Sequence, residues 1–427
     1  MLMPPLCGKF ACGGKSGEHP SWAHLRPNTA SVVGAGTPGP RRPGALLYLV
    51  AATFFHFASL YYLLSTLPLY VRSLGGSTSQ VGLIIGILAL TSLAARPVIG
   101  PWIDRAGRRP FLLAGAAIYA LSSLGYGIIP SVRGLLVWRV FHGIGLATFS
   151  TAAASLAADV APAGQRGRTM GVFGLAQAAA LTVGPGAGQF ILATFGYLGV
   201  FVASASTAVL AFVCASALPR EQPPGQMPPG RTGVESSALW RILALPAAFQ
   251  FVASVAYGTI ISFIAVSARD RALEAVGPFF ALLALSSLGV RLAAGRAYDR
   301  WGPAATLIPM FLVLATGMAG IAVATEPMLL LTAAILAGLG IGGTHTTLIS
   351  SVVDGAPSDR RASGVAGFAA CWELGVGGGT VLMGHLADAR GFETMFLVVA
   401  AFPILGLAAL LCLGRGTLAG VAAVRSD

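Results

Sequence analysis

The chain is a succession of apolar stretches, each about 20 residues long, that follow one another with short polar breaks from about Leu46 to Leu413. A helix of that length spans the ~30 Å hydrocarbon core of a bilayer. Because the stretches are continuously apolar, they predict helices rather than the ~10-residue alternating strands of a transmembrane barrel. We predict twelve transmembrane helices, at residues 46–71, 79–101, 110–130, 134–158, 168–193, 197–217, 241–265, 276–298, 304–324, 328–353, 362–387 and 393–414.

Composition and charge distribution support a membrane protein. Hydrophobic residues make up 55% of the 427 residues and charged residues 10%, against roughly a quarter charged in soluble domains. The net charge of +12 is compatible with nucleic-acid binding, but its distribution argues against such a partner. From Arg41 onward, sixteen arginines fall in one set of alternate loops and the tails, and five fall in the other set of loops. The positive-inside rule therefore predicts a multi-pass protein of the inner (plasma) membrane with both termini in the cytoplasm.

The sequence contains an internal repeat. The stretch "SLAARPVIGPWIDRAG", which begins at Ser92, aligns with "SLGVRLAAGRAYDRWG", which begins at Ser287, at a shift of 195 residues. The same shift, without gaps, pairs Phe54 with Phe249, Ser59 with Ser254, Tyr62 with Tyr257, Gly143 with Gly338, Gly145 with Gly340, Asp159 with Asp354, Pro162 with Pro357, Arg166 with Arg361 and Gly184 with Gly379. We therefore predict two six-helix halves in parallel orientation.

This repeat predicts the domain organisation. We expect a disordered cytoplasmic leader at residues 1–44 and a first six-helix bundle at 45–218, then a Pro/Gly-rich cytoplasmic linker at 219–238. A second bundle follows at 239–414 and a cytoplasmic tail at 415–427. Parallel halves are related by a pseudo-twofold axis along the membrane normal, and this arrangement places a substrate site between them near mid-membrane.

Three short motifs carry a family resemblance. The loop between predicted helices 2 and 3 contains Gly100, Asp104, Arg105, Gly107, Arg108 and Arg109; predicted helix 4 contains Arg139, His142, Gly143 and Gly145; and predicted helix 5 contains "VGPGAG", Val183 to Gly188. These motifs resemble those of the major facilitator superfamily, with His142 in place of a usual Gln and Gln189 in place of a usual Gly. The resemblance covers all but the leader and tail. It implies an all-α membrane protein of twelve transmembrane helices in two pseudo-symmetric six-helix bundles, most similar to the drug and sugar efflux permeases.

The charged loop between predicted helices 2 and 3 permits two interpretations. Gly107 allows a tight turn, the arginines remain at the anionic cytoplasmic interface, and Asp104 can pair with a nearby arginine or a helix N-terminus. In one interpretation the loop is a simple topology anchor. In the other, which the resemblance supports, it is a conformational latch that closes one face and releases during transport. This latch comprises Gly100, Asp104, Arg105, Gly107, Arg108 and Arg109, with Asp299 and Arg300 in the second half.

Three residues are candidates for proton coupling. Glu373 is the only carboxylate deep inside a predicted helix, where intramembrane acids usually face a cavity and act functionally. It either carries protons or contacts substrate, or it is a buried glutamate that hydrogen-bonds for packing. Arg139 and His142 lie one turn apart on predicted helix 4. Arg139 modulates a proton site, holds an anionic group of the substrate, or makes a structural pair.

Four side chains are candidates for the substrate cavity. The resemblance implies that helices 1, 4, 7 and 10 line it, which selects His56, Tyr62, Tyr257 and His345. Each histidine can equally be a core residue. A metal site made by His56, His345 and Glu373 would require all three to converge, and we predict neither a metal nor a cofactor.

Predicted helix 5 carries a small-residue face that permits close packing, formed by Gln177, Ala180, Gly184 and Gly188, and Pro185 can bend the helix. We expect a tight, leak-resistant seam there; a bias toward export by antiport is implied only by the resemblance.

Two alternative functional classes are disfavoured. The segment "GLGIGG", Gly338 to Gly343, fits a nucleotide-binding pattern, but it lies inside an apolar helix without the required preceding strand or following acid. The chain has no complete Gly-x-x-x-x-Gly-Lys-Ser/Thr phosphate-binding loop, so we predict neither ATP-driven transport nor an enzyme. A membrane sensor would need a sizeable soluble domain, which the sequence lacks.

We therefore predict a monomeric secondary transporter that exports small organic molecules in exchange for protons. The alternative is a proton-coupled importer of a small organic anion or another solute, favoured if Arg139, His56 and His345 form a cationic pocket for a carboxylate.

Overall fold

The computed structural model describes residues 44–161, 166–219, 236–356 and 361–412. These ranges are almost entirely helical and contain no strand, and they belong to one compact unit, Pro43–Asp427. The predicted leader up to residue 43, residues 220–235 of the predicted linker and the predicted tail lie outside the described residues.

The described residues form nine helical elements, each long and apolar enough to cross a membrane. They are α1 (Ala45–Ser73), α2 (Thr78–Ala106), α3 (Arg108–Ile128), α4 (Val132–Val160), α5 (Arg166–Ser216), α6 (Ser236–Asp270), α7 (Val276–Val323), α8 (Pro327–Gly355) and α9 (Arg361–Cys412).

Glycine turns join successive helical segments. Gly107, between α2 and α3, has φ +89° and ψ 163°, a backbone conformation that is essentially confined to glycine. Gly196 in α5, Gly302 in α7 and Gly391 in α9 adopt the same kind of conformation and interrupt the helical backbone there. Each of these three long elements therefore consists of two helical segments that meet at a turn.

The backbone repeats at the offset found in the sequence. The α4 and α8 helices are both 29 residues long and start 195 residues apart. The same offset relates the turns at Gly107 and Gly302, and those at Gly196 and Gly391. The repeat is therefore expressed in helix bounds and turn geometry as well as in side-chain identity.

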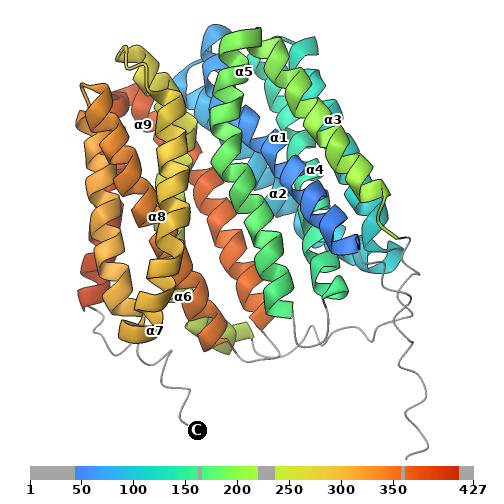
Figure 1. Ribbon diagram of the computed structural model, residues 1–427. Coiled ribbons are helices and arrows are strands. Elements are labelled where there is room, and N and C mark those ends of the chain that lie inside the picture. Colours follow the sequence, from blue (N-terminus) through green and yellow to red (C-terminus); the bar gives the residue numbers. More distant parts are fainter. Residues whose placement is uncertain (1–43, 162–165, 220–235, 357–360, 413–427) are drawn as a thin grey trace, which may run out of the picture. The chain divides into compact units, whose positions relative to one another are not determined.

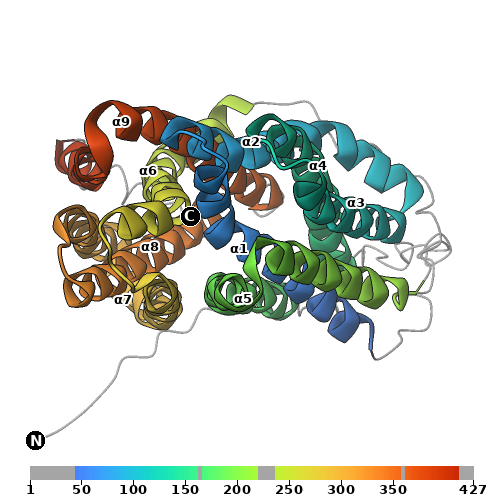
Figure 2. The ribbon, with the colours of Figure 1, turned by 90° about the horizontal axis from the view of Figure 1, so that it is seen from above.

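The helices pack in two groups (Figures 1 and 2). The first group is α1–α5, in which α1 packs on α5 and α3 packs on α4; the second is α6–α9, in which α7 packs on α8 and α6 on α9. The groups touch mainly where α2 packs on α9 and α5 packs on α7. We call the end at which α1 turns into α2 the Gly75 end, and the end at which α2 turns into α3 the Gly107 end.

Glycines bring α2 and α9 together near the Gly75 end. A Cβ atom on Gly82 would collide with the Thr380 carbonyl oxygen, and one on Gly86 would collide with the Gly377 carbonyl oxygen. Gly384 likewise approaches the start of α2. The two backbones are therefore in direct contact, as small residues permit in membrane helices.

A carboxylate from the second group caps the start of α2. Ser77 and Gln80 form a capping box at this helix start. In addition, Asp388 of α9 accepts hydrogen bonds from the backbone N–H groups of Thr78 and Ser79, at 2.9 and 2.8 Å. This carboxylate therefore links the two groups at the Gly75 end.

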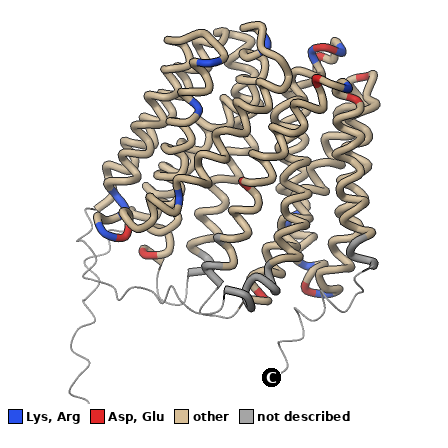
Figure 3. The backbone as a smooth tube through the Cα atoms, turned by 180° about the vertical axis from the view of Figure 1, so that it is seen from behind, with Lys and Arg blue, Asp and Glu red and all other residues tan. Residues whose placement is uncertain are grey.

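The largest apolar cluster also joins the groups. It includes Leu67 and Ile85 of the first group with Ile260, Phe263 and Phe280 of the second. Charged residues, in contrast, gather at the two ends of the helices and are sparse between them (Figure 3). The packing between the two helical groups is thus mainly apolar. The few charged residues midway along the helices are therefore candidates for a functional role.

Candidate functional site

A cavity of about 510 Å³ lies between the two helical groups. Side chains from every described helix except α3 line it. Most of the lining is apolar, and three charged side chains enter it: Arg96 from α2, Arg291 from α7 and Glu373 from α9. Its volume is in the range typical of small-molecule sites, which are also mainly apolar with a few placed polar groups.

Glu373 forms an ion pair with Arg96 inside this cavity. The Nη2 atom of Arg96 donates to Oε1 of Glu373 and also lies 3.5 Å from the Ser150 hydroxyl of α4. The Glu373 side chain is 15% exposed and that of Arg96 is 33% exposed. Because α2 and α9 belong to different groups, the pair bridges the two groups within the cavity.

Arg291 is the repeat counterpart of Arg96, and its surroundings differ. Among the described residues no Asp or Glu lies within ion-pair distance of Arg291, and its buried Nε atom has no hydrogen-bond partner. It lies within electrostatic reach of Tyr61, Tyr257 and His345. The cavity therefore contains one arginine that is neutralised and one that is not.

Aromatic side chains form the wall of the cavity on the side of the second group. The rings of Tyr257 and Trp372 lie 5.0 Å apart, and His345 lies 5.4 Å from both Trp372 and Phe368. All four residues line the cavity. The candidates Tyr257 and His345 are thus placed together here with Glu373, although each comes from a different helix.

His56 and Tyr62 do not line this cavity. His56 is fully buried in the first group, where its ring stacks on Phe149 at 3.9 Å and contacts Tyr119 at 4.3 Å. The backbone of Tyr62 lies against Gly188 of α5, and the neighbouring Tyr61 lines the cavity instead. The reason is rotation, because a step of one residue turns a side chain by about 100° around the helix.

Arg139 and His142 lie in a buried cluster inside the first group, and neither lines the cavity. Nε of Arg139 donates to the Ile84 carbonyl oxygen at 3.1 Å, and its guanidinium lies 5.9 Å from the centre of the Tyr126 ring. The Tyr126 hydroxyl is 2.6 Å from Nδ1 of His142. No carboxylate among the described residues pairs with Arg139, and its buried Nη1 and Nη2 atoms have no hydrogen-bond partner there.

The predicted latch residues form ion pairs at the Gly107 end. Arg108, whose side chain is 8% exposed, lies 3.6 Å from Asp104 and 2.9 Å from Asp159 of α4. Arg109 donates to the Ser216 carbonyl oxygen at the end of α5, at 2.6 Å. Arg105 is exposed and Gly100 is half-buried with open space beside it. The cluster therefore ties α2, α3, α4 and α5 of one group to each other.

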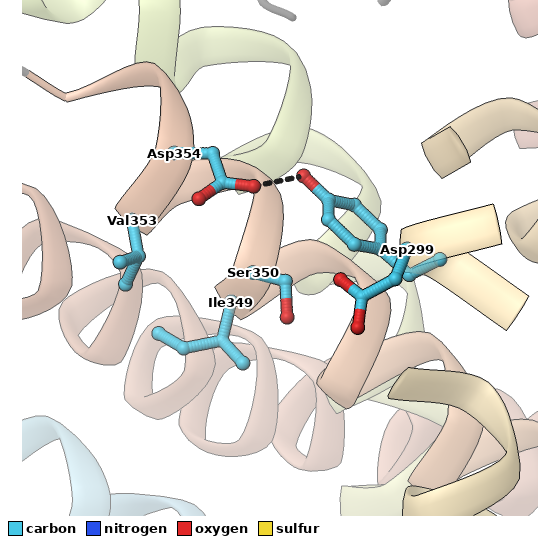
Figure 4. Close-up of a pocket in the computed structure, with 6 residues that line it drawn as sticks. Asp299, Ile349, Ser350, Val353 and Asp354 are labelled. Carbon is cyan, nitrogen blue, oxygen red and sulfur yellow. Dashed lines mark hydrogen bonds between the residues drawn. The ribbon is translucent and has the colours of Figure 1, made fainter. Parts of the chain in front are cut away.

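The second group carries a different version of this cluster (Figure 4). Asp299 lines a recess of about 220 Å³ with Asp354 of α8, and the Tyr298 hydroxyl donates to Asp354 at 3.1 Å. Arg300 is exposed and lies over the ring of Trp301, 5.5 Å from its centre. Because Pro303 stands at the position that corresponds to Arg108, a tyrosine takes the place of the arginine as the donor to the α8 carboxylate.

The small residues of α5 pack against α1. A Cβ atom on Gly184 would collide with the Tyr61 side chain, and one on Gly188 would lie 2.7 Å from the Tyr62 carbonyl oxygen. The Ser65 hydroxyl donates to the Pro185 carbonyl oxygen at 3.1 Å. The seam between α1 and α5 is therefore close and partly polar.

Metal binding has no support in the described part of the chain, where no group of three or more His, Cys, Asp or Glu side chains could hold an ion. Of the three residues in the hypothetical metal site, His345 and Glu373 line the cavity and His56 does not.

Arg96 and Arg291 are site residues that sequence reasoning missed. Both arginines lie in the stretches that the repeat aligns, just before the charged loops. The sequence signal that could have identified them is their depth in the predicted membrane helix. Each arginine stands eight residues before the loop aspartate and so lies about two helical turns inside an apolar stretch. An arginine at such a depth usually faces a cavity or a partner.

Comparisons with known proteins agree on a family. A model of the Major Facilitator Superfamily matches residues 49–375. The chain is 25% identical over 362 residues to an uncharacterized MFS-type transporter of Methanocaldococcus jannaschii, a match that covers 82% of this chain and 93% of that protein. It is 28% identical over 167 residues to multidrug resistance protein 2 of Bacillus subtilis, a match that covers 39% of this chain and 42% of that protein.

Solved structures show the same fold. A bacterial homolog to the human lysosomal transporter Spinster, in an inward-facing and occupied conformation, matches with a TM-score of 0.74 and 18% identity over 89% of this chain and 98% of that one. The nucleoside transporter NupG matches with a TM-score of 0.72 and 14% identity over 87% of this chain and 99% of that one.

Proposed function

Because this chain belongs to the Major Facilitator Superfamily, and is therefore a multi-pass membrane transporter rather than an enzyme, we propose that it exports small organic molecules in exchange for protons. It does so by alternating access, in which the two helical groups rock about the cavity that lies between them.

The proposal includes a topology. The turns at Gly196, Gly302 and Gly391 divide α5, α7 and α9 into two crossings each, which gives twelve. The two bundles are residues 45–218 and 239–414, and the transporter works as a monomer in the inner membrane. Both termini and the Gly107 end face the cytoplasm, because the arginine-rich loops gather there.

The observation that carries the proposal is the ion pair between Arg96 and Glu373. It lies in the cavity and joins the two groups. A proton on Glu373 removes the negative charge and with it most of the attraction to Arg96. Protonation therefore weakens a link between the two helical groups, which must move relative to each other during transport. In this way proton binding can be coupled to the conformational cycle.

Export is favoured by the similarity to the multi-drug resistance efflux pump PmrA of Streptococcus pneumoniae, which is 27% identical to this chain over 164 residues. The second candidate is import of a small organic anion, and one observation favours it, namely the unneutralised Arg291 in the cavity. The sequence predicts a cationic pocket of Arg139, His56 and His345 for such a substrate. Of these three residues, only His345 lines the cavity.

The charged cluster at the Gly107 end has a proposed role as well. Because Arg108 holds Asp104 and Asp159 together, it fixes the helix ends of the first group as one body during rocking. Arg139 and His142 are proposed to contribute to the rigidity of that body, since they lie away from the cavity.

Transport by Glu373→Gln tests the coupling. Inside-out vesicles with an imposed pH gradient are given a panel of acidic, neutral and basic aromatic solutes, and solute flux is measured between pH 6 and pH 8. We expect a wild-type flux that depends on pH, and a Glu373→Gln flux that does not, because the amide side chain of this variant cannot exchange a proton as a carboxylate does. A matched control is Glu393→Gln, which alters an exposed carboxylate in the same element and should retain the wild-type profile.

Wild-type pH dependence in Glu373→Gln would remove Glu373 from the coupling role. Solute accumulation in cells distinguishes direction: accumulation that rises on deleting the gene supports export, whereas uptake that rises with an inward proton gradient supports import.

A further inference from the structure

Arg291 lines the cavity, as its repeat counterpart Arg96 does. Among the described residues, however, it has no carboxylate partner of the kind that Arg96 has. In the first copy, Arg96 pairs with Glu373. The offset of 195 residues converts Arg96 into Arg291, and it relates Glu373 to Ala178. Ala178 on α5 and Arg291 on α7 both line the cavity, and α5 and α7 pack on each other. The repeat therefore assigns to Arg291 the methyl group of Ala178, in the place of the carboxylate that Glu373 supplies to Arg96.

From this asymmetry we infer that the cavity binds a small organic anion, and that the anionic group of the substrate takes the place next to Arg291 that Ala178 leaves open. The inference rests on the proposed transport function, applies to export and to import alike, and adds a substrate class. A guanidinium is suited to this role because it stays charged and presents paired donors to a carboxylate or another oxyanion.

The surroundings of Arg291 favour an anion. Tyr61 and Tyr257 lie within electrostatic reach of its guanidinium, and within the described ranges neither hydroxyl group has a hydrogen-bond partner. Both can donate to an oxyanion held by the arginine. Glu373 forms its ion pair with Arg96, and among the described residues no ion pair joins it to Arg291.

The charge balance indicates one negative charge on the substrate. With His345 neutral, the cavity contains two positive charges and one negative charge. A monoanion would bring the sum to zero, which matters because an unbalanced charge in a low-dielectric cavity is unfavourable.

The remaining lining indicates the body of the substrate. The rings of Tyr257, Trp372, His345 and Phe368 form a continuous wall, and such rings pack well against flat apolar groups. We therefore infer an aromatic or otherwise apolar body that carries one acidic group, of a size that fits about 510 Å³.

The experiment compares acids with their uncharged amides. Full-length protein in lipid nanodiscs is titrated with naphthalene-2-carboxylate, benzoate and indole-3-acetate, each beside its primary amide, and binding is measured by calorimetry. At least one acid should bind about tenfold or more tightly than its amide, as expected for a charge-assisted contact. If no acid of the panel binds more tightly than its amide, the inference is overturned.

Substitutions at position 178 localise the effect. Ala178→Glu supplies a carboxylate to Arg291 from the protein itself, as Glu373 does for Arg96, and should reduce the ratio of acid to amide affinity to about one. Ala178→Gln fills the same volume without charge, so it should weaken acid and amide together and preserve their ratio. An undiminished ratio in Ala178→Glu would overturn the inference.

Arg291→Gln provides a second route that adds no bulk, and it also should bring the ratio to about one. Size-exclusion elution and thermal unfolding confirm that each variant is folded. Because binding is measured at equilibrium without a gradient, failure here is distinct from failure of the proposed export or proton coupling.

Discussion

The contact between Asp388 and the start of α2 joins the two helical groups, and we expect its removal to favour their separation at the Gly75 end. Both carboxylate oxygens accept backbone N–H groups, from Thr78 and Ser79. These N–H groups belong to the first turn of a helix, where no intrahelical acceptor exists. Asp388→Ala removes both acceptors, and Asp388→Asn removes the charge but retains one acceptor oxygen.

The magnitude follows from known helix-start energetics. Loss of a capping side chain costs about 1 kcal/mol, and loss of a negative charge near a helix N-terminus costs about 0.3–1 kcal/mol at exposed sites such as this one. We therefore expect Asp388→Ala to destabilise the closed Gly75 end by about 1–2 kcal/mol and Asp388→Asn by about 0.5–1 kcal/mol. The ratio of open to closed molecules should rise about 5- to 30-fold and about 2- to 5-fold, respectively.

Distances between spin labels on the two groups report this equilibrium. Arg133 at the start of α4 and Met328 at the start of α8 are exposed and correspond through the repeat. Both lie at the Gly75 end. With the five cysteines replaced by alanine and labels at these positions, double electron–electron resonance in nanodiscs should show a longer-distance population that grows in Asp388→Ala.

Ser77→Ala is the matched control. The Ser77 hydroxyl caps the same helix from within its own group, accepting from the N–H of Gln80 at 3.2 Å. Its loss should lower thermal stability without changing the label distances. The reasoning is refuted if Asp388→Ala leaves the distance distribution of the wild type unchanged, or if Ser77→Ala shifts that distribution equally.

Two further predictions concern stability, each measured as thermal unfolding in detergent. Gly338→Ala should destabilise the protein by about 1–3 kcal/mol, because its Cβ would collide with the backbone of α7. Gly289 has open space around it, so Gly289→Ala should leave the stability unchanged. Equal destabilisation by the two variants would contradict the packing argument. Tyr126→Phe should cost about 1–3 kcal/mol, because it leaves the buried His142 without its partner; Tyr48→Phe at an exposed site should be neutral, and an unaffected Tyr126→Phe would contradict the hydrogen bond.

The sequence predicted the order and bounds of the helical segments well, for a simple physical reason. Lipid requires about 20 apolar residues per crossing, so each crossing is visible in the sequence. The predicted breaks at 193–197, 298–304 and 387–393 contain the turn glycines Gly196, Gly302 and Gly391. The repeat also predicted that α4 and α8 would correspond.

The cavity was only partly predictable. Glu373 stood out because a lone carboxylate in an apolar helix is conspicuous, but its partner Arg96 did not, because sequence does not show which helices face each other. The same limit explains the position of Tyr61 in the cavity and of Tyr62 outside it, and the stacking of His56 on Phe149. Periodicity defines faces on a helix but not the rotation of that helix against its neighbours.

The imbalance of charge among Arg96, Arg291 and Glu373 has an electrical consequence. In the proposed exchange the carrier returns with a proton on Glu373, so it moves the two positive charges of the arginines through part of the membrane field. Each full charge carried across 100 mV corresponds to about 2.3 kcal/mol. A carrier loaded with a monoanion moves none. Voltage would then act only on the step in which the carrier returns without substrate. The resting potential of the cell would therefore bias the side of the membrane to which the substrate-free cavity opens.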